Sequence, residues 1–306
     1  MKPYAFIINP VAGKVKKLDI HNLIESNATR FKIKTETYIT KRPGHAIEIS
    51  KHLTRNNKYY AVIAVGGDGT VNEVVNGFNL TSEALFGLLP FGSGNDVGRF
   101  IYSNGNSNYF DILFDQTRHS IVELDVGDCT IKEQNETIIN RRFINAVGIG
   151  FDAYVAYLNQ FEKKLSGILS YILAVMRALK SIKNLDVNIK LDGEEIIGKF
   201  LLLTVGNGKT SGGGFFLNPD ADPTDGVLNL TSVDSGSRFD VIKNLPYALV
   251  DKLKKVKKAK FFLSRDINIK LNEPYYVHLD GEIGSQAAIE FNILLAGKKL
   301  KTIKSK

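Results

Sequence analysis

The residues best suited to chemistry in this sequence lie in a glycine-rich turn around one aspartate. Gly66, Gly67 and Gly69 enclose Asp68, after the apolar run at residues 60–65 and before valines at helical spacing. A strand that passes through glycines into a helix is typical of a phosphate site, because glycine lets the backbone approach the anion and the helix start offers unpaired N–H groups. A simple anion site would avoid a negative charge. The aspartate therefore indicates a metal-bridged polyphosphate or a catalytic role.

Two further turns share this placement at the end of an apolar strand. Residues 85–89 lead into Gly92-Ser93-Gly94-Asn95-Asp96, and residues 4–8 lead into Asn9-Pro10-Val11-Ala12-Gly13. The second of these turns is not a P-loop, because the second glycine and the Lys-Ser/Thr pair are missing. Thr40 stands at the end of a further predicted strand. Because ligands bind at the carboxyl ends of parallel strands, we expect all of these turns to line one cleft.

The elements that must position these turns alternate along the first part of the chain. We expect helices near residues 19–29 and 44–55, and a strand at residues 31–38, between the apolar strands named above. This alternation predicts a mainly parallel sheet covered by helices on both faces. The first domain is therefore expected to be α/β and to occupy residues 1–125.

After about residue 120 the pattern changes to short strands separated by Gly, Asp and Asn turns, as in a sandwich or barrel. The expected strands are residues 121–126, 137–146, 187–191, 195–205, 227–233, 260–269, 275–279 and 288–295. Helical patterns interrupt them at residues 152–182 and 238–258. With no long linker in the chain, we expect a second packed domain at residues 126–295, an all-β sandwich with inserted helices.

Composition limits where the protein works. The chain has 306 residues, a net charge of +8 and a single cysteine, Cys129, which rules out an intrachain disulfide and Cys-rich zinc sites. No apolar stretch approaches the roughly 18 residues that span a bilayer, and the N-terminus has no signal-peptide pattern. We therefore expect a cytoplasmic, soluble protein.

Part of the positive charge is concentrated near the C-terminus. Six lysines between residues 252 and 260 alternate with apolar residues: Lys252, Lys254, Lys255, Lys257, Lys258 and Lys260. One interpretation is a solvated helix face, and the other is contact with anionic lipid headgroups. The basic residues do not accompany a recognised nucleic-acid module, so no nucleic-acid partner is expected.

Several motifs in the second half could also carry chemistry. Asp125 ends the strand that leaves the first domain, and Leu279-Asp280-Gly281-Glu282 follows a strand. Glycine-spaced segments occupy residues 145–152, 206–215 and 219–226. Each Asp-Gly pair is by itself a turn signal, and Asp192-Gly193 is interpreted as a turn only.

In their order along the whole chain, these motifs resemble the bacterial diacylglycerol kinase-like lipid kinase family, which includes sphingosine and ceramide kinases. The resemblance rests on Asn9-Pro10 with Gly13 and on residues 66–76, 92–99, 145–152, 213–215, 225–226 and 279–282. It implies an N-terminal domain related to NAD kinases and phosphofructokinases, a C-terminal β-sandwich, and ATP bound in the cleft between them. It also implies that residues 296–306 return to the first domain.

The implied reaction is transfer of the γ-phosphoryl group of ATP to a lipid hydroxyl, with Mg²⁺. Nucleotide contacts are implied at Asn9, Pro10, Val11, Ala12, Gly13, Thr40, Gly66, Gly67, Asp68, Gly69, Thr70, Val71, Asn72, Glu73 and Ser93. An acidic network near the phosphates and Mg²⁺ is implied at Asp68, Asp96 and Asp125, and a general base at Glu282. A structural metal ion is implied at the Asp225 side chain, with the backbone carbonyls of Asp222 and Val227.

Physical chemistry agrees with these roles. Oxygen-only ligands suit Mg²⁺, and a glutamate at a rigid strand end near a closed cleft can act as a base. The acceptor lipid stays open among diacylglycerol, a sphingoid base, phosphatidylglycerol and other lipid alcohols. An acyl chain could enter along the helical region at residues 154–182. Without an anchor, the protein is expected to work peripherally at the inner face of an anionic membrane, and exposed sandwich edges would allow a homodimer.

Two alternatives stay open at this point. An NAD kinase shares the Gly-Gly-Asp-Gly turn, although the glycine loop at residues 212–215 and the Leu-Asp-Gly-Glu motif favour a lipid kinase. A non-catalytic nucleotide-binding or lipid-binding protein is the other alternative. The presence of Asp68, Asp96 and Glu282 together argues against it.

Overall fold

The computed structural model describes residues 2–13, 15, 19–92, 94–102, 108–161 and 168–306. The chain divides into two compact units. The first comprises Met1–Leu124 with Gly297–Lys306, and the second comprises Asp125–Ala296. Asp125 therefore belongs to the second unit, and the C-terminal segment belongs to the first.

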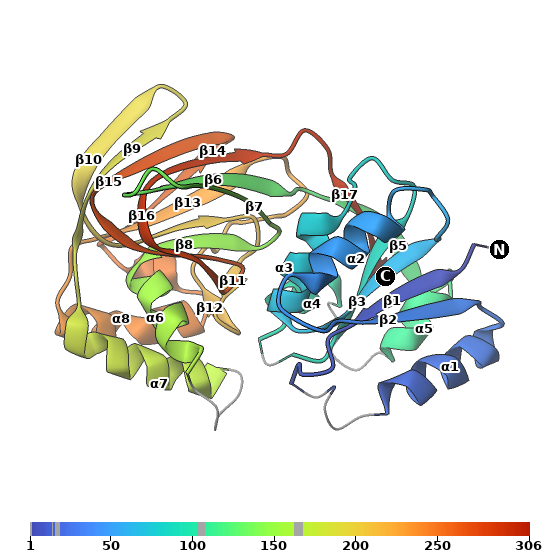
Figure 1. The fold of residues 1–306 in the computed structure, drawn as a ribbon. Coiled ribbons are helices and arrows are strands. Elements are labelled where there is room, and N and C mark those ends of the chain that lie inside the picture. The colour runs from blue at the N-terminus through green and yellow to red at the C-terminus, as the bar shows by residue number, and fades with distance from the viewer. Residues whose placement is uncertain (1, 14, 16–18, 93, 103–107, 162–167) are drawn as a thin grey trace. The chain divides into compact units, whose positions relative to one another are not determined.

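The described part of the first unit contains a six-stranded sheet in the order β2-β1-β3-β4-β17-β5 (Figure 1). Its strands are β1 (Tyr4–Ile8), β2 (Thr35–Ile39), β3 (Ala61–Gly66), β4 (Leu85–Pro90), β5 (His119–Leu124) and β17 (Leu300–Ser305). Strands β1 to β4 are mutually parallel, whereas β17 runs parallel to β4 and antiparallel to β5. Strands β1, β3 and β4 are buried along their whole length, as expected for a sheet covered on both faces. The expected mainly parallel sheet is confirmed.

Helices cover both faces of this sheet. Helices α2 (His45–Leu53) and α3 (Asp68–Gly77) pack together on one face, and α1 (Ile20–Phe31) and α5 (Tyr109–Phe114) lie on the other (Figure 1). Helix α4 (Asp96–Ile101) follows β4. The strand expected at residues 31–38 starts later, because α1 continues to Phe31 and ends at Lys32, whose φ is 55°.

The order of the strands places a crevice at a definite point of the sheet. The chain passes from β1 to β2 on one side, and then returns to β3 on the other side of β1. Such a reversal leaves an open crevice at the carboxyl ends of β1 and β3, where ligands bind in open α/β sheets. Asn9 and Gly66 stand at these two strand ends.

The second unit is built on a nine-stranded, antiparallel sheet in the described residues, in the order β14-β13-β10-β8-β15-β16-β6-β7, with β9 pairing β10 and β15. Its strands are β6 (Gly127–Glu133), β7 (Ile138–Phe143), β8 (Ala146–Gly150), β9 (Leu185–Leu191), β10 (Glu194–Gly206), β13 (Leu228–Asp234), β14 (Ala259–Ser264), β15 (Asp266–Leu279) and β16 (Glu282–Leu295). A small hairpin adds β11 (Thr210–Ser211) and β12 (Phe215–Phe216). The expected mainly β second domain is confirmed, although the strand predicted at residues 260–269 is divided between β14 and β15.

Three helices gather on one side of this sheet (Figure 1). They are α6 (Phe151–Asn159), α7 (Ile168–Ala178), which continues into the 3-10 turn η2 (Leu179–Ser181), and α8 (Arg238–Leu249). The single helical region expected at residues 152–182 is therefore at least two helices, with residues 162–167 outside the described residues.

The helix expected at residues 238–258 was predicted too long. Helix α8 ends at Leu249, and Asp251 then adopts a left-handed φ of 53°, which breaks the helical path. Lys254 and Lys255 lie in the 3-10 turn η3 (Leu253–Lys255), and Lys260 lies in β14. The lysines at 252–260 are therefore not one face of a helix.

Candidate active site

Three turns at the carboxyl ends of β1, β3 and β4 contact one another in the first unit. The N–H groups of Phe91 and Gly92 donate to the carbonyl oxygen of Gly66 at 2.9 and 3.1 Å. A Cβ atom at Gly92 would lie 2.1 Å from the Cα atom of Gly67, and one at Gly13 would lie 2.5 Å from the carbonyl oxygen of Phe91. Glycine is therefore required where these backbones meet.

Asn9 joins the first of these turns to the second. Its side-chain amide donates to the Thr70 hydroxyl at 3.1 Å, and its Oδ1 accepts from the N–H of Val11 at 3.1 Å. A Cβ at Gly66 would lie 2.4 Å from the same Thr70 hydroxyl. The structure thus brings together Asn9, Val11, Gly66 and Thr70. Pro10 and Ala12 lie on the same turn as Val11.

Asp68 and Asp96 are neighbours. Asp68 starts α3, and its Oδ1 accepts from the N–H of Asp96 at 2.9 Å. Asp96 is buried and forms an ion pair with Arg99, with 3.6 Å between Oδ1 and Nη1. Ser93, which the sequence also predicts as a nucleotide contact, lies outside the described residues.

Other predicted nucleotide contacts have structural partners. The Glu73 carboxylate accepts from the N–H groups of Gly44 and Ala46 at 2.8 and 3.1 Å, so it caps the start of α2. Val71 and Asn72 are buried in α3, and the N–H of Thr40 donates to the Ile8 carbonyl. Gly67 and Gly69, by contrast, are partly exposed at the start of α3.

In the second unit, Asp125 holds the loop that contains the predicted metal ligands. Its N–H donates to the Pro223 carbonyl at 2.7 Å, and its Oδ2 accepts from the N–H of Gly226 at 2.8 Å. Asp222 and Asp225 are exposed, and their Oδ1 atoms accept from backbone N–H groups two residues further on. Among the described residues, no three His, Cys, Asp or Glu side chains form a metal-ligand group. A cation here would therefore depend on backbone carbonyl and water oxygens as well as carboxylates.

Glu282 follows a two-residue hairpin turn. Asp280 and Gly281 have positive φ values of 52° and 87°, and Leu279 pairs with Glu282 across the turn. The buried Asp280 carboxylate accepts from the N–H groups of Asn145 and Ala146 through Oδ1 at 2.8 and 3.0 Å, and from Ile144 through Oδ2 at 3.0 Å. Glu282 itself is exposed as the first residue of β16. The turn that carries the candidate base is therefore anchored by its buried neighbour.

A buried asparagine links this hairpin to the Asp125 loop. The Asn207 amide donates to the carbonyls of Asp125 and Ile144, each at 2.8 Å. Asn207 is fully buried, and its N–H donates to the Asn145 carbonyl at 2.8 Å. In the sequence, Asn207 belongs to the glycine-spaced segment at residues 206–215 and Asp280 to the motif at residues 279–282, and their linking role was not predicted.

His278 makes a second connection to the hairpin. Its Nδ1 accepts from the N–H of Gly281 at 3.2 Å, so its Nε2 carries the proton and donates to Asp152 Oδ2 at 2.9 Å. A Cβ at Gly148 would lie 2.2 Å from His278 Nε2 and 2.3 Å from Asp152 Oδ2, so glycine is required there. Helix α6, which carries Asp152, is thereby tied to the turn before Glu282.

Two family models match the chain in succession. The model described as the diacylglycerol kinase catalytic domain matches residues 3–129, and that described as the YegS C-terminal NAD kinase beta sandwich-like domain matches residues 145–296. This chain belongs to the diacylglycerol kinase-like family of lipid kinases. The resemblance drawn from its motifs is confirmed, and so is its assignment as a kinase.

Relatives of this kinase match along nearly all of its length. A diacylglycerol kinase of Staphylococcus carnosus (strain TM300) is 29% identical over a 290-residue alignment that covers 93% of this kinase and 90% of that protein. A diacylglycerol kinase of Staphylococcus haemolyticus (strain JCSC1435) is also 29% identical, over 93% of this kinase and 83% of that protein.

Solved structures share the fold. A diacylglycerol kinase structure from Bacillus anthracis str. Sterne has a TM-score of 0.68 at 21% identity, covering 99% of this kinase and 97% of that chain. Yeast NADH kinase complexed with NADH has a TM-score of 0.57 at 10% identity, covering 99% of this kinase and 84% of that chain. At these identities the likeness concerns the fold alone.

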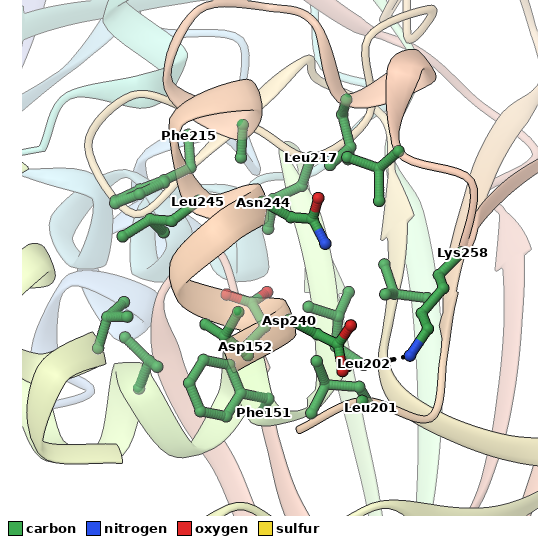
Figure 2. Close-up of a pocket in the computed structure, with 18 of the residues that line it drawn as sticks. Phe151, Asp152, Leu201, Leu202, Phe215, Leu217, Asp240, Asn244, Leu245 and Lys258 are labelled. Carbon is green, nitrogen blue, oxygen red and sulfur yellow. Dashed lines mark ion pairs between the residues drawn. The ribbon is translucent and has the colours of Figure 1, made fainter. Parts of the chain in front are cut away.

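The kinase also has an apolar pocket in its second unit, with a volume of about 100 Å³, lined by α6, α7, α8 and the sheet. Figure 2 shows Phe151, Leu201, Leu217 and Leu245 among the lining residues. Asp240 and Lys258 form an ion pair at 3.3 Å in the same lining. None of the helices in the described residues combines the length and hydrophobicity needed to cross a bilayer.

Proposed function

We propose that this kinase transfers the γ-phosphoryl group of ATP to the hydroxyl of diacylglycerol or a closely related lipid alcohol, with Mg²⁺. The observation that carries this proposal is the contact between the apolar pocket and the Glu282 hairpin. Tyr171 lines the pocket, and its hydroxyl lies 3.5 Å from where a Cβ atom at Gly281 would be. Asp152 also lines the pocket and bonds His278, which bonds the Gly281 N–H. An acyl chain in the pocket would thus place a lipid hydroxyl near the candidate base.

The turns of the first unit suit the nucleotide. Gly67 and Gly69 lie partly exposed at the start of α3, at the crevice between the ends of β1 and β3. Phosphate groups bind at helix starts because the backbone N–H groups there are unpaired and the helix dipole is positive. These features support binding of the ATP phosphates, with Asn9 and Gly13 shaping the neighbouring turn.

The donor set also fits Mg²⁺, which prefers oxygen ligands. Asp68 and Asp96 would serve a cation near the phosphates, and Asp222, Asp225 and the Val227 carbonyl would serve one in the loop held by Asp125. When bound, Mg²⁺ neutralises charge on the phosphates.

In the proposed reaction, the lipid hydroxyl oxygen forms a bond to the γ-phosphorus while the bond from that phosphorus to the bridging oxygen of ADP breaks. The Glu282 carboxylate accepts the hydroxyl proton, as a positioned base does in other phosphoryl transfers. The anchored hairpin of Asp280 fixes the backbone from which this carboxylate projects. Because it stands at the end of a paired strand, little reorganisation is needed when substrate arrives.

The test combines a substrate comparison with a matched pair of variants. Purified protein is incubated with Mg·ATP and either detergent-dispersed diacylglycerol or NAD, and the products are identified by mass. We expect phosphatidic acid and no phosphorylated NAD. Glu282→Gln should reduce turnover by about a hundredfold or more while ATP binding is retained, in line with the loss of a general base.

The chain supplies its own control for this variant. Leu191-Asp192-Gly193-Glu194 repeats the residue types of Leu279-Asp280-Gly281-Glu282, and Glu194 is also exposed and follows a hairpin turn. Glu194→Gln should leave turnover unchanged. Phosphorylation of NAD instead of lipid would replace the proposal with an NAD kinase, and a fully active Glu282→Gln variant would remove the assigned base.

A further inference from the structure

The outer face of α8 carries an exposed apolar stripe. Phe239, Ile242 and Val250 are 72%, 51% and 56% exposed, and Pro246 is exposed between them. Counted from Phe239, the other positions follow at three, seven and eleven residues, which places them along one side of a helix, with Val250 just beyond its end. The opposite side packs inward through Val241 and Ala248. The helix is therefore apolar on two sides, of which only one is buried.

The segment that carries this stripe, and the residues that follow it, are rich in positive charge. Residues 238–258 contain seven cations and two acids. The cations are Arg238, Lys243, Lys252, Lys254, Lys255, Lys257 and Lys258. Of the acids, Asp240 is paired with Lys258, and Asp251 is exposed. Lys254 pairs with Asp220 at 2.5 Å, which leaves an excess of exposed positive charge on α8 and on the residues that follow it.

The inner side of the same helix lines the apolar pocket. Leu245 and Ala248 contribute to its wall, and Leu253 and Val256 extend that wall beyond the helix. Helix α8 thus has the apolar pocket on one side and the exposed stripe on the other. A helix with an apolar face of Phe, Ile and Val beside lysines is the pattern that lies in a membrane interface.

We propose that the outer face of α8 docks on an anionic bilayer, with Phe239, Ile242 and Val250 entering the headgroup region and the neighbouring lysines contacting lipid phosphates. A second copy of the chain is the less suitable occupant. Two-fold pairing through this face would bring the lysines of both copies together, and like charges across an interface oppose association. The biological role of this docking rests on the proposed lipid kinase function, but vesicle binding itself is measured without any enzymatic turnover.

The experiment measures flotation of the full-length protein with phosphatidylglycerol vesicles and with phosphatidylcholine vesicles. We expect binding to phosphatidylglycerol that weakens with salt. The double variant Phe239→Ser/Ile242→Ser should lose this binding by about tenfold or more, because two apolar side chains no longer enter the interface. The triple variant Lys252→Gln/Lys255→Gln/Lys257→Gln should lose the preference for phosphatidylglycerol.

A matched control is an exposed isoleucine outside α8. Ile197 on β10 is 74% exposed, and Ile197→Ser should bind vesicles as the unchanged protein does. All variants should keep their activity on detergent-dispersed diacylglycerol, since none of these positions lines the pocket or the hairpin. Unfolding temperatures equal to that of the parent protein confirm that folding is intact.

The outcomes separate this inference from the proposed function. If the double variant binds vesicles as well as the unchanged protein does, docking through α8 is overturned, whatever the kinase activity. Loss of binding in the double variant supports docking even if no lipid is phosphorylated, in which case the proposed function alone fails. If the double variant instead converts a dimer to a monomer by light scattering and still binds vesicles, the stripe is a self-association surface and the bilayer proposal is wrong.

Discussion

At the scale of single residues, three backbone N–H groups converge on one buried carboxylate. Asp280 is 4% exposed and accepts from residues 144, 145 and 146 at 2.8–3.0 Å. This side chain therefore provides the acceptor for three successive backbone N–H groups at the start of β8. A carboxylate with such partners is expected to be more important to stability than to chemistry.

We predict that Asp280→Ala lowers the free energy of unfolding by about 3 kcal/mol or more, because several buried donors lose their acceptor. Asp192→Ala is the control, since Asp192 occupies the same turn position in an exposed hairpin. Its effect should be limited to about 1 kcal/mol, the cost of placing alanine at the positive φ of this turn, which Asp280→Ala also bears. Urea unfolding measures both, and equal losses in the two variants would contradict the anchoring role.

Cys129 gives a second prediction at this scale. The thiol is buried on β6, and burial, with a smaller contribution from Asp128, raises its pKa to about 12. Because the thiolate is the reactive form, the folded protein should not react with a thiol reagent at about pH 8. The protein unfolded in urea should react with one equivalent. Rapid modification of the folded protein would show that this part of the sheet opens readily.

At the scale of elements, the start of α8 depends on a reciprocal cap. The Ser237 hydroxyl accepts from the N–H of Asp240, and the Asp240 carboxylate accepts from the N–H of Ser237 at 2.8 Å. Hydrogen bonds from Ser237, and then the bond from Lys258, lower the pKa of Asp240 from 3.8 to about 2. The half of the cap that the Asp240 carboxylate makes is therefore strongest while this carboxylate is ionised, whereas the bond to the Ser237 hydroxyl does not depend on its charge.

The sign of the resulting pH dependence follows from that lowered pKa. The folded state holds the Asp240 carboxylate ionised. The contribution of this carboxylate to the free energy of unfolding is therefore fully present above about pH 4 and is lost as the pH falls toward about 2. The variant Asp240→Asn lacks this contribution, so its stability should fall less than that of the parent protein between about pH 5 and pH 2.5. Urea unfolding at the two pH values gives the comparison. Parallel losses would mean that Asp240 does not govern this dependence.

Local sequence signals predicted the interior of most elements better than their ends. The strands β1, β3 and β4 were recognised because they are continuous apolar runs bounded by glycine turns. Helix α8 was predicted too long, because Leu253 and Val256 continue an apolar pattern beyond Leu249. In the structure, these two side chains pack from a 3-10 turn and a loop rather than from a helix. Burial by tertiary contacts produces the same periodicity as a helix over such a short distance.

At the scale of the whole molecule, the chain ends by completing the sheet with which it began. Strand β17 lies between β4 and β5, and its residues Leu300, Thr302 and Ile303 are fully buried. It pairs with β5 along six residues. The first unit therefore depends on a segment that follows the entire second unit in the sequence.

We predict that deleting residues 297–306 destabilises the first unit strongly, because β4 and β5 lose the strand between them and the buried side chains of Leu300 and Ile303 are removed. Each fully buried apolar side chain contributes about 1.5–3 kcal/mol, so the loss from these two alone should be several kcal/mol. Thermal unfolding followed by circular dichroism measures it. The control is Lys306→Ala at the exposed chain end, which should unfold as the parent protein does. Unchanged unfolding of the deleted protein would show that β17 is dispensable.

The candidate site was predicted in part, for a definite reason. Glycine turns after apolar strands are local features, and they led correctly to the contacts among Gly13, Gly66 and Gly92. The capping role of Glu73 was not foreseen, because its partners Gly44 and Ala46 lie far from it in the sequence. The links made by Asn207 and His278 were missed for the same reason.

The same four residue types occur twice in this chain. Comparing the two copies shows what the sequence determines and what the tertiary structure adds. Leu-Asp-Gly-Glu at residues 191–194 and at 279–282 has one local meaning, a hairpin turn with two positive φ values, and both turns form. Sequence alone determined that much, because turn chemistry depends on neighbours in the chain. Only the tertiary structure decided that Asp280 is buried against three N–H groups, with Tyr171 beside Gly281, while Asp192 stays exposed. The residues that donate hydrogen bonds to Asp280 lie more than a hundred positions away in the sequence. Local propensity, which depends on neighbours in the chain, therefore cannot predict these contacts.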